Sequence, residues 1–239
     1  MSALPRLATR TARAKQDPDP ALAFAAGAGQ LVTVCGLHGG AGTTTLAVAI
    51  ATAAAQASGP GRVLATETDP AGGELAARYG AASAITVHDL ARGRTLQGAP
   101  FATLESGLRL LAAAPGERTA AAPDQLAQVL DDARPVHGLI VVDAGIVREP
   151  HTTAALARAS TIIWTVGADR AEQLDAMLAS PLTRRGCGAR WVIAVRPVPG
   201  HTINLRHAKS AAATAHAVVK LPDDTGPVAL ANAIAPALT

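Results

Sequence analysis

The sequence contains few aromatic residues, cysteines and lysines. Aromatic side chains make up 2% of the 239 residues, so the core has to be built from aliphatic side chains. The two cysteines, Cys35 and Cys187, exclude a disulfide scaffold and favour a reducing compartment. Charged residues reach only 16%, which excludes a charge-rich coiled coil and a disordered polyelectrolyte. Arginine carries most of the positive charge, and a formal net charge of +3 is too small to establish nucleic-acid binding.

Long hydrophobic runs are also missing. The longest stretch of low polarity, residues 46–57, is interrupted by Thr52 and Gln56, and it is shorter than the roughly 18–20 residues of a membrane span. The basic N-terminus is followed by Asp-Pro-Asp-Pro at residues 17–20 instead of the apolar core of a signal peptide. We therefore expect a cytoplasmic protein.

The chain divides into a short extension and one domain. Residues 1–28 are first basic, then rich in Asp and Pro, then rich in Ala and Gly, and they show no hydrophobic period. We expect a flexible N-terminal tail there, with a docking segment as the alternative. Residues 29–239 are long enough for a single domain with a sizeable core.

Short apolar runs alternate with helical patterns along this domain. Nearly continuous apolar strands that alternate with helices indicate an α/β fold with a mainly parallel, doubly wound sheet and helices on both faces. The predicted strands are 31–35, 62–66, 107–113, 138–143, 161–166, 190–195 and 217–221. The predicted helices are 43–58, 123–133, 152–159, 171–179, 204–216 and 228–238.

A glycine-rich loop links the first predicted strand to the first helix. Its sequence, His-Gly-Gly-Ala-Gly-Thr-Thr-Thr, occupies residues 38–45. Glycines allow backbone N–H groups to face a phosphate, and the following helix N-terminus adds positive potential. We expect phosphate binding here, with a tight structural turn as the alternative. The expected binding residues are His38, Gly39, Gly40, Ala41, Gly42, Thr43, Thr44 and Thr45.

Three acids follow predicted strands near this loop. Glu67 and Asp69 come after the second strand, and Asp143 ends the strand 138–143. We take all three as candidate catalytic acids, although acids at such positions also cap helices. The Thr44 hydroxyl and the Asp143 carboxylate are the predicted ligands of Mg²⁺.

These motifs together resemble the ParA/MinD family of P-loop ATPases, which have a deviant Walker A motif. The resemblance covers residues 30–239 and includes Asp-Pro-Ala-Gly-Gly at 69–73, Asp-Ala-Gly at 143–145 and Leu-Pro-Asp-Asp at 221–224. It implies a homodimer that binds ATP or ADP with Mg²⁺. It also implies that Pro222 and Asp223 lie near the nucleotide base.

The departures from the family pattern are as informative as the matches. His38 stands at the signature lysine that reaches across the dimer, which places it at the dimer seam, and Thr43 stands at the Walker lysine. Glu67 replaces the first acid of Asp-x-Asp, and Arg196-Pro197 replaces an adenine-reading Asn. Because fixed positive charges contribute strongly to phosphate chemistry, weak or no hydrolysis is expected.

A glycine loop without the Walker lysine resembles the CpaE/TadZ-like branch, which implies a pseudo-ATPase that positions pilus or secretion machinery. One alternative is an active ATPase in which Arg170 or Arg196 replaces the lysines. A second is plasmid or chromosome partitioning with non-specific DNA binding through Arg184, Arg185 and Arg190. A third is an interaction module without nucleotide. The C-terminal residues 228–239 contain no basic residue, so we expect no membrane anchor of the MinD type.

Overall fold

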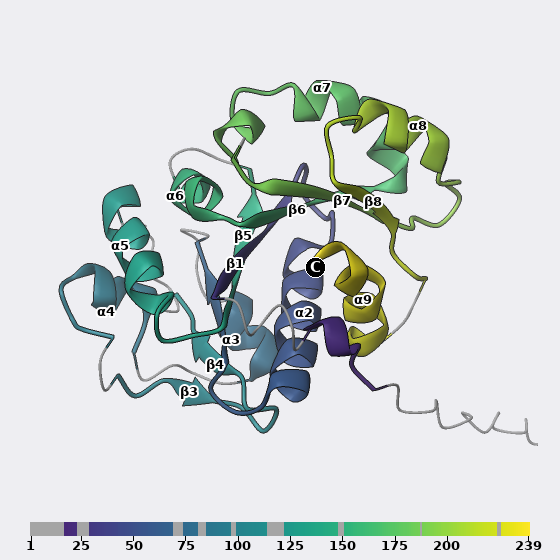
Figure 1. The fold of residues 1–239 in the computed structure, drawn as a ribbon. Coiled ribbons are helices and arrows are strands. Elements are labelled where there is room, and N and C mark those ends of the chain that lie inside the picture. The colour runs from purple at the N-terminus through teal and green to yellow at the C-terminus, as the bar shows by residue number, and fades with distance from the viewer. Residues whose placement is uncertain are drawn as a thin grey trace, which may run out of the picture.

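The computed structural model describes residues 17–22, 29–68, 74–80, 85–96, 99–113, 122–147, 151–186, 188–223 and 226–239 (Figure 1). Of the sequence motifs above, residues 69–73, which include Asp69, lie outside this range. Cys187 and Asp224 lie outside it as well.

One sheet forms the centre of the domain. In the described part of the chain it has eight strands in the order β3-β4-β2-β5-β1-β6-β7-β8, and only the β3–β4 pair is antiparallel. The strands are β1 (Gln30–Gly36), β2 (Val63–Glu67), β3 (Ala102–Thr103), β4 (Arg109–Leu111), β5 (Leu139–Ile146), β6 (Thr161–Gly167), β7 (Arg190–Arg196) and β8 (Ala217–Lys220).

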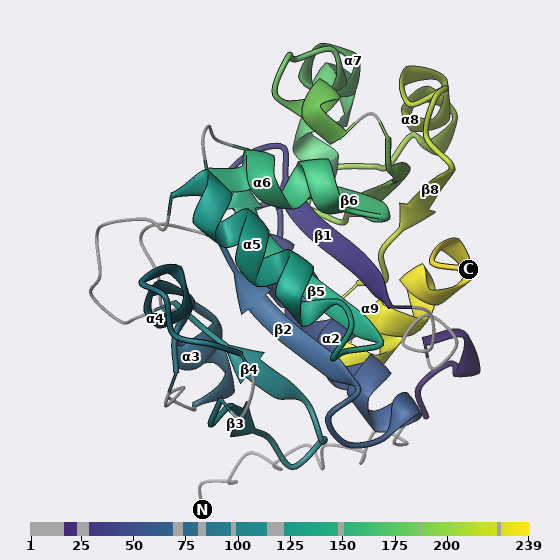
Figure 2. The ribbon, with the colours of Figure 1, turned by 60° about the vertical axis from the view of Figure 1, so that its left-hand side comes forward.

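Helices cover both faces of this sheet. Figure 1 shows α7 and α8 on one side of β6–β8 and α2 and α9 on the other, and Figure 2 shows α5 and α6 in front of β5 and β1. The helices are α2 (Thr43–Ser58), α3 (Glu74–Tyr79), α4 (Val87–Ala91), α5 (Pro123–Ala133), α6 (His151–Arg158), α7 (Leu174–Leu178), α8 (Leu205–Ala211) and α9 (Pro227–Ile234). The short 3₁₀ helices are η1 (Ala168–Gln173), η2 (Thr183–Gly186) and η3 (Ala235–Ala237).

The strand pattern explains the two layers. In β1, Val32 and Val34 pack into the cluster shared with α2 and α9, whereas Leu31 packs into the cluster shared with α5. Successive strand residues point to opposite faces, so a continuous apolar run buries both of them. The predicted α/β class is confirmed.

Helix α2 is enclosed by protein on several sides. It lies between the sheet and α9, and its buried residues include Leu46, Ile50 and six alanines. A helix buried all round needs no polar stripe, which explains its weak amphipathic pattern. Alanine also allows the close packing of α9 against α2. The N-terminus of α2 is thereby held at the carboxyl end of β1.

Residues 17–22, part of the segment expected to be a flexible tail, dock on α9. Leu22 is fully buried in the core cluster that contains α2 and α9. The Asn232 side chain accepts a hydrogen bond from the Asp19 N–H (2.8 Å) and donates one to the Asp17 carbonyl (3.0 Å). Residues 17–22 are thus packed on the domain, and the expectation for the rest of residues 1–28 lies outside the described residues.

Candidate functional site

The loop between β1 and α2 approaches the sheet closely. Gly36 leaves no room for a Cβ, which would lie 2.5 Å from Thr43 Oγ1. Gly40 (φ 74°) and Gly42 (φ 87°) have left-handed backbone conformations, which residues other than Gly, Asn and Asp rarely adopt. The Gly42 carbonyl accepts the first helical hydrogen bond of α2 from Leu46 (3.0 Å). The glycines therefore set the path of the loop.

A cavity of about 430 Å³ opens beside this loop. It contains seven of the eight predicted loop residues, Gly39 being the exception, and no acidic residue belongs to its described lining. The lining residues are His38, Gly40, Ala41, Gly42, Thr43, Thr44, Thr45, Arg78, Gly145, Ile146 and Arg196.

The N-terminus of α2 faces this cavity without a cap. Its N-cap residue is Gly42, no described side chain accepts a capping hydrogen bond there, and the first turn contains no acid. The first backbone N–H groups of a helix have no partner inside the helix, and they carry the positive end of its dipole. The amides of Thr43, Thr44 and Thr45 are thus suited to an anion.

Two arginines also line the cavity. Arg196, the last residue of β7, donates from Nη2 to the Gly40 carbonyl oxygen at 2.8 Å. Arg78 comes from α3, which the sequence did not predict as a helix, so no sequence signal pointed to it. Arg170, the other arginine considered, pairs with Asp169 at 3.8 Å and does not line the cavity.

His38 is held by its own chain. Its Nε2 accepts a hydrogen bond from the Gly167 N–H at 2.9 Å, and its Nδ1 lies 2.8 Å from the Gly39 carbonyl oxygen. Because a backbone N–H can only donate, Nε2 must carry the lone pair and Nδ1 the proton. The ring therefore ties the loop to the end of β6, and its place at a dimer seam stays a prediction.

The three loop threonines differ in their surroundings. Thr43 is 8% exposed, and its hydroxyl lies 2.9 Å from the hydroxyl of Thr165 on β6. Thr44 is half-buried and Thr45 is exposed, and both line the cavity. The residue at the Walker lysine position thus anchors the loop to the sheet, whereas Thr44 and Thr45 are the threonines whose hydroxyls have room for a ligand.

Glu67 is used to hold backbone together. It is 1% exposed at the end of β2, and its Oε2 accepts from the Leu75 N–H (3.2 Å) while Oε1 accepts from the Ala113 N–H (2.8 Å). Leu75 lies in the first turn of α3, so the carboxylate serves as a cap for that helix. These contacts give Glu67 a structural role, and its catalytic role stays a prediction.

Asp143 is a buried acid of β5, two residues before the cavity-lining Gly145. It is 3% exposed in β5, and its Oδ1 accepts a hydrogen bond from the Gly145 N–H (3.1 Å), a residue that lines the cavity. A carboxylate and a hydroxyl oxygen are ligands of the kind Mg²⁺ prefers. Magnesium binding by Thr44 and Asp143 stays a prediction.

A second cavity of about 510 Å³ lies beyond the end of β7. Its lining residues are Pro197, Val198, Pro199, His201, Thr202, Ile203, Lys220 and Asp223, and Arg196, the residue before Pro197, lines the loop cavity. Asp223 is exposed and Pro222 half-buried beside it. These are the two residues that the resemblance placed near a nucleotide base.

Cys35 has no chemical role in this site. It is fully buried on β1, and burial, with a smaller effect of the Asp143 charge, raises the pKa of its thiol far above the usual range. Because the thiolate is the reactive form, the thiol is inert at neutral pH. No group of three or more His, Cys, Asp or Glu residues suited to a metal ion occurs in the described ranges.

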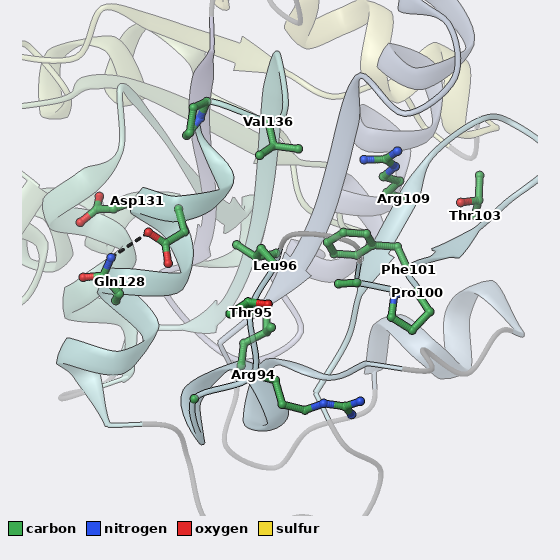
Figure 3. A pocket seen from close by; sticks show the side chains of 15 residues that line it. Arg94, Thr95, Leu96, Pro100, Phe101, Thr103, Arg109, Gln128, Asp131 and Val136 are labelled. Atoms are coloured by element: carbon green, nitrogen blue, oxygen red, sulfur yellow. Dashed lines mark hydrogen bonds between the residues drawn. The ribbon is translucent and has the colours of Figure 1, made fainter.

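A larger cavity, of about 920 Å³, lies between α4, α5 and the β3–β4 pair (Figure 3). Arg109 lies over the Phe101 ring at 5.6 Å, and the Gln128 side chain donates to Asp132 at 2.8 Å. Arg109 begins β4 and Val136 precedes β5, so this cavity is at the amino ends of the parallel strands. Ligands of open α/β sheets bind at the carboxyl ends, where the glycine loop is.

The arginine cluster predicted for DNA does not form one free surface. Arg190 donates from Nη2 to the Leu238 carbonyl (2.7 Å) and from Nη1 to the Thr239 carbonyl (3.1 Å), so it secures the C-terminus. Arg184 is exposed on η2. Among the helices that the structure describes, none has the length and apolar character needed to cross a membrane.

Comparisons with known proteins identify the fold. No model of a protein family and no curated protein sequence matches the chain. Among solved structures, MinD of Pyrococcus furiosus matches with a TM-score of 0.73 and 16% identity over 87% of this chain and 99% of that one. MinD of Pyrococcus horikoshii, solved with Mg-ADP, matches at 0.68 and 18% over 88% of each chain. A ParA family ATPase of Chlorobium tepidum matches at 0.63 and 16% over 88% and 93%.

The chain has the fold of the MinD structures. In the MinD-like fold described here, the glycine loop, Asp143 and the loop after β8 lie at the carboxyl ends of the strands. Identities of 16–18% show that the fold is shared. They do not show which ligand or partners this chain binds, or to which branch of such proteins it belongs.

Proposed function

We propose that the chain binds a nucleotide, ATP or ADP, with the phosphates in the loop cavity. The observation that carries this proposal is that the cavity is open and is bounded by the uncapped N-terminus of α2 and the left-handed glycines Gly40 and Gly42. Main-chain amides that converge on an open cavity bind anions. Mg²⁺, held by Thr44 and Asp143, would neutralise part of the phosphate charge.

The second cavity supplies a place for the base. Its lining begins at Pro197, the residue after Arg196 of the loop cavity, and includes Asp223. Leu221, just before Pro222, donates its N–H to the Val195 carbonyl at 2.9 Å, which fixes this segment against β7. A nucleotide would extend from the glycine loop along the ends of β6 and β7.

Hydrolysis should be slow or absent. Thr43 and His38, at the two lysine positions, hold the loop to β6, and Glu67 holds the start of α3. None of the three therefore offers a mobile cation or a free base to the reacting phosphate, and stabilisation of developing charge is the largest contribution to such catalysis.

We further propose that the chain acts as a dimeric, cytoplasmic positioning factor for pilus or secretion machinery. This rests on the resemblance of the lysine-free loop at residues 38–45 to the CpaE/TadZ-like branch. In this role the bound nucleotide would stabilise one conformation instead of driving turnover.

Isothermal titration calorimetry of the purified chain with Mg-ATP and Mg-ADP tests nucleotide binding. We expect saturable heat and a nucleotide-dependent rise in melting temperature, with phosphate release at background. Gly40→Asp puts an acid in the cavity and should weaken binding by about tenfold or more. Gly80→Asp is the matched control, because both glycines have positive φ and open space around a Cβ, and Asp tolerates such φ values. Absence of both heat and thermal shift for the native chain would overturn the proposal.

A further inference from the structure

We propose that Arg196, assisted by Arg78, makes the cationic contacts to the ligand phosphates that the two absent lysines would have made. The inference rests on the proposed phosphate site and adds the source of its charge. In this chain the positive charge comes from the end of β7 and from the helix α3, and not from the loop between β1 and α2.

Arg196 reaches the loop from two strands away. It ends β7 opposite Gly167 of β6, and β6 in turn pairs with β1, from which the loop departs. Its Nη2 donates to the Gly40 carbonyl (2.8 Å), and a Cβ built on Gly42 would lie 2.9 Å from its Cδ. The guanidinium therefore lies across the two glycines that shape the cavity.

The hydrogen bonding of Arg196 leaves capacity for a ligand. A guanidinium has five N–H donors in a planar fork that suits phosphate oxygens. One donor is used on the Gly40 carbonyl, and the Nε atom is buried with no hydrogen-bond partner in the described part of the chain. Because Nε is enclosed, the other N–H groups of Nη1 and Nη2 are the donors that a phosphate oxygen in the cavity would meet, and such charge-assisted hydrogen bonds are strong.

Arg78 approaches the same cavity from the other side. It lies in α3, which follows β2, and the sheet order places β2 and β7 on opposite sides of β1. The hydroxyl of the next residue, Tyr79, donates to the Val48 carbonyl of α2 (3.3 Å), which holds α3 near the start of the loop helix. The described lining thus contains Arg196 and Arg78 and no acidic residue, a composition that favours an anionic ligand.

Calorimetry measures the affinity for four ligands, which are Mg-ATP, Mg-ADP, AMP and inorganic tripolyphosphate. Each is titrated into the native chain and into the variants Arg196→Ala, Arg196→Lys, Arg78→Ala and Arg170→Ala. Arg196→Ala should weaken Mg-ATP and tripolyphosphate by about tenfold to a hundredfold, the range of a lost charge-assisted hydrogen bond. The loss should be smaller for AMP, which has one phosphate. Arg196→Lys should recover part of the affinity, and Arg78→Ala should cause a smaller loss.

Arg170→Ala is the control variant, and tripolyphosphate distinguishes failure of this inference from failure of nucleotide binding. Arg170 lies near the same edge of the sheet but pairs with Asp169, so Arg170→Ala should bind like the native chain. Tripolyphosphate binding that depends on Arg196 supports the inference even if nucleotides fail to bind. Nucleotide binding that is unchanged in Arg196→Ala overturns this inference but leaves the proposed nucleotide site standing. Tighter binding in Arg196→Ala does the same, and it would mean that the Arg196 side chain occupies space that the ligand needs. Failure of every anion to bind the native chain overturns both.

Discussion

The buried carboxylate of Glu67 offers a direct measurement of whether this acid is structural or catalytic. Glu67→Ala removes the acceptors of two buried N–H groups, those of Leu75 and Ala113. An unsatisfied buried N–H costs about 1–3 kcal/mol, so the loss should be about 2–6 kcal/mol. That is a large share of the roughly 5–15 kcal/mol by which a domain is stable.

Glu67→Gln separates the two roles more finely. The amide keeps one acceptor oxygen but turns an NH₂ group toward one of the two N–H donors, so the variant should lie between the native chain and Glu67→Ala. Urea unfolding followed by circular dichroism measures the free energy of unfolding for all three. Glu105→Ala is the control, because Glu105 is exposed and should change stability by no more than about 0.5 kcal/mol.

Two results would contradict the structural role. One is a loss below about 1 kcal/mol for Glu67→Ala, since this would mean that the two N–H groups are satisfied elsewhere. The other is a Glu67→Gln variant with native stability but altered phosphate release, which would return the residue to catalysis.

Two further predictions concern pH and the loop anchor. Burial lowers the pKa of His137 from its usual 6.5. The hydrogen bond to the Gly61 carbonyl opposes this shift, and the Arg109 charge adds a smaller lowering. The unfolded chain therefore binds a proton first, so the urea midpoint should fall as pH drops through 6.5, and the fall should be smaller in His137→Gln. Thr43→Val removes the buried hydroxyl pair with Thr165 and should cost about 1 kcal/mol in urea unfolding. Its Mg-ATP affinity by calorimetry should stay near the native value, and a tenfold drop would show that the hydroxyl meets the ligand instead.

The sequence predicted the fold well where elements are long and periodic. The continuous apolar run 161–166 became β6 with one residue added, and the run 138–143 became β5, which continues three residues further to Ile146. A buried parallel strand needs apolar side chains on both faces, which is why such runs are recognisable. The short elements α4 (Val87–Ala91) and β3 (Ala102–Thr103) were not predicted, since five and two residues are too few to show a period.

The site was predicted in position but not in all its roles. The glycine spacing located the cavity, because φ values at Gly40 and Gly42 follow from the residue type. The partners of Glu67, however, come from segments 8 and 46 residues away along the chain, which no local pattern encodes. Arg78 likewise joined the cavity only through the placement of α3.

The two borders of the sheet also limit how copies of this chain can associate. The described sheet ends in β3, with two residues, and in β8, with four, so each border presents few unpaired backbone groups to another molecule. Pairing of two subunits strand to strand would therefore gain little. A homodimer of this protein, if formed as expected, would have to meet through side chains and loops, and its strength could then respond to what the loops hold.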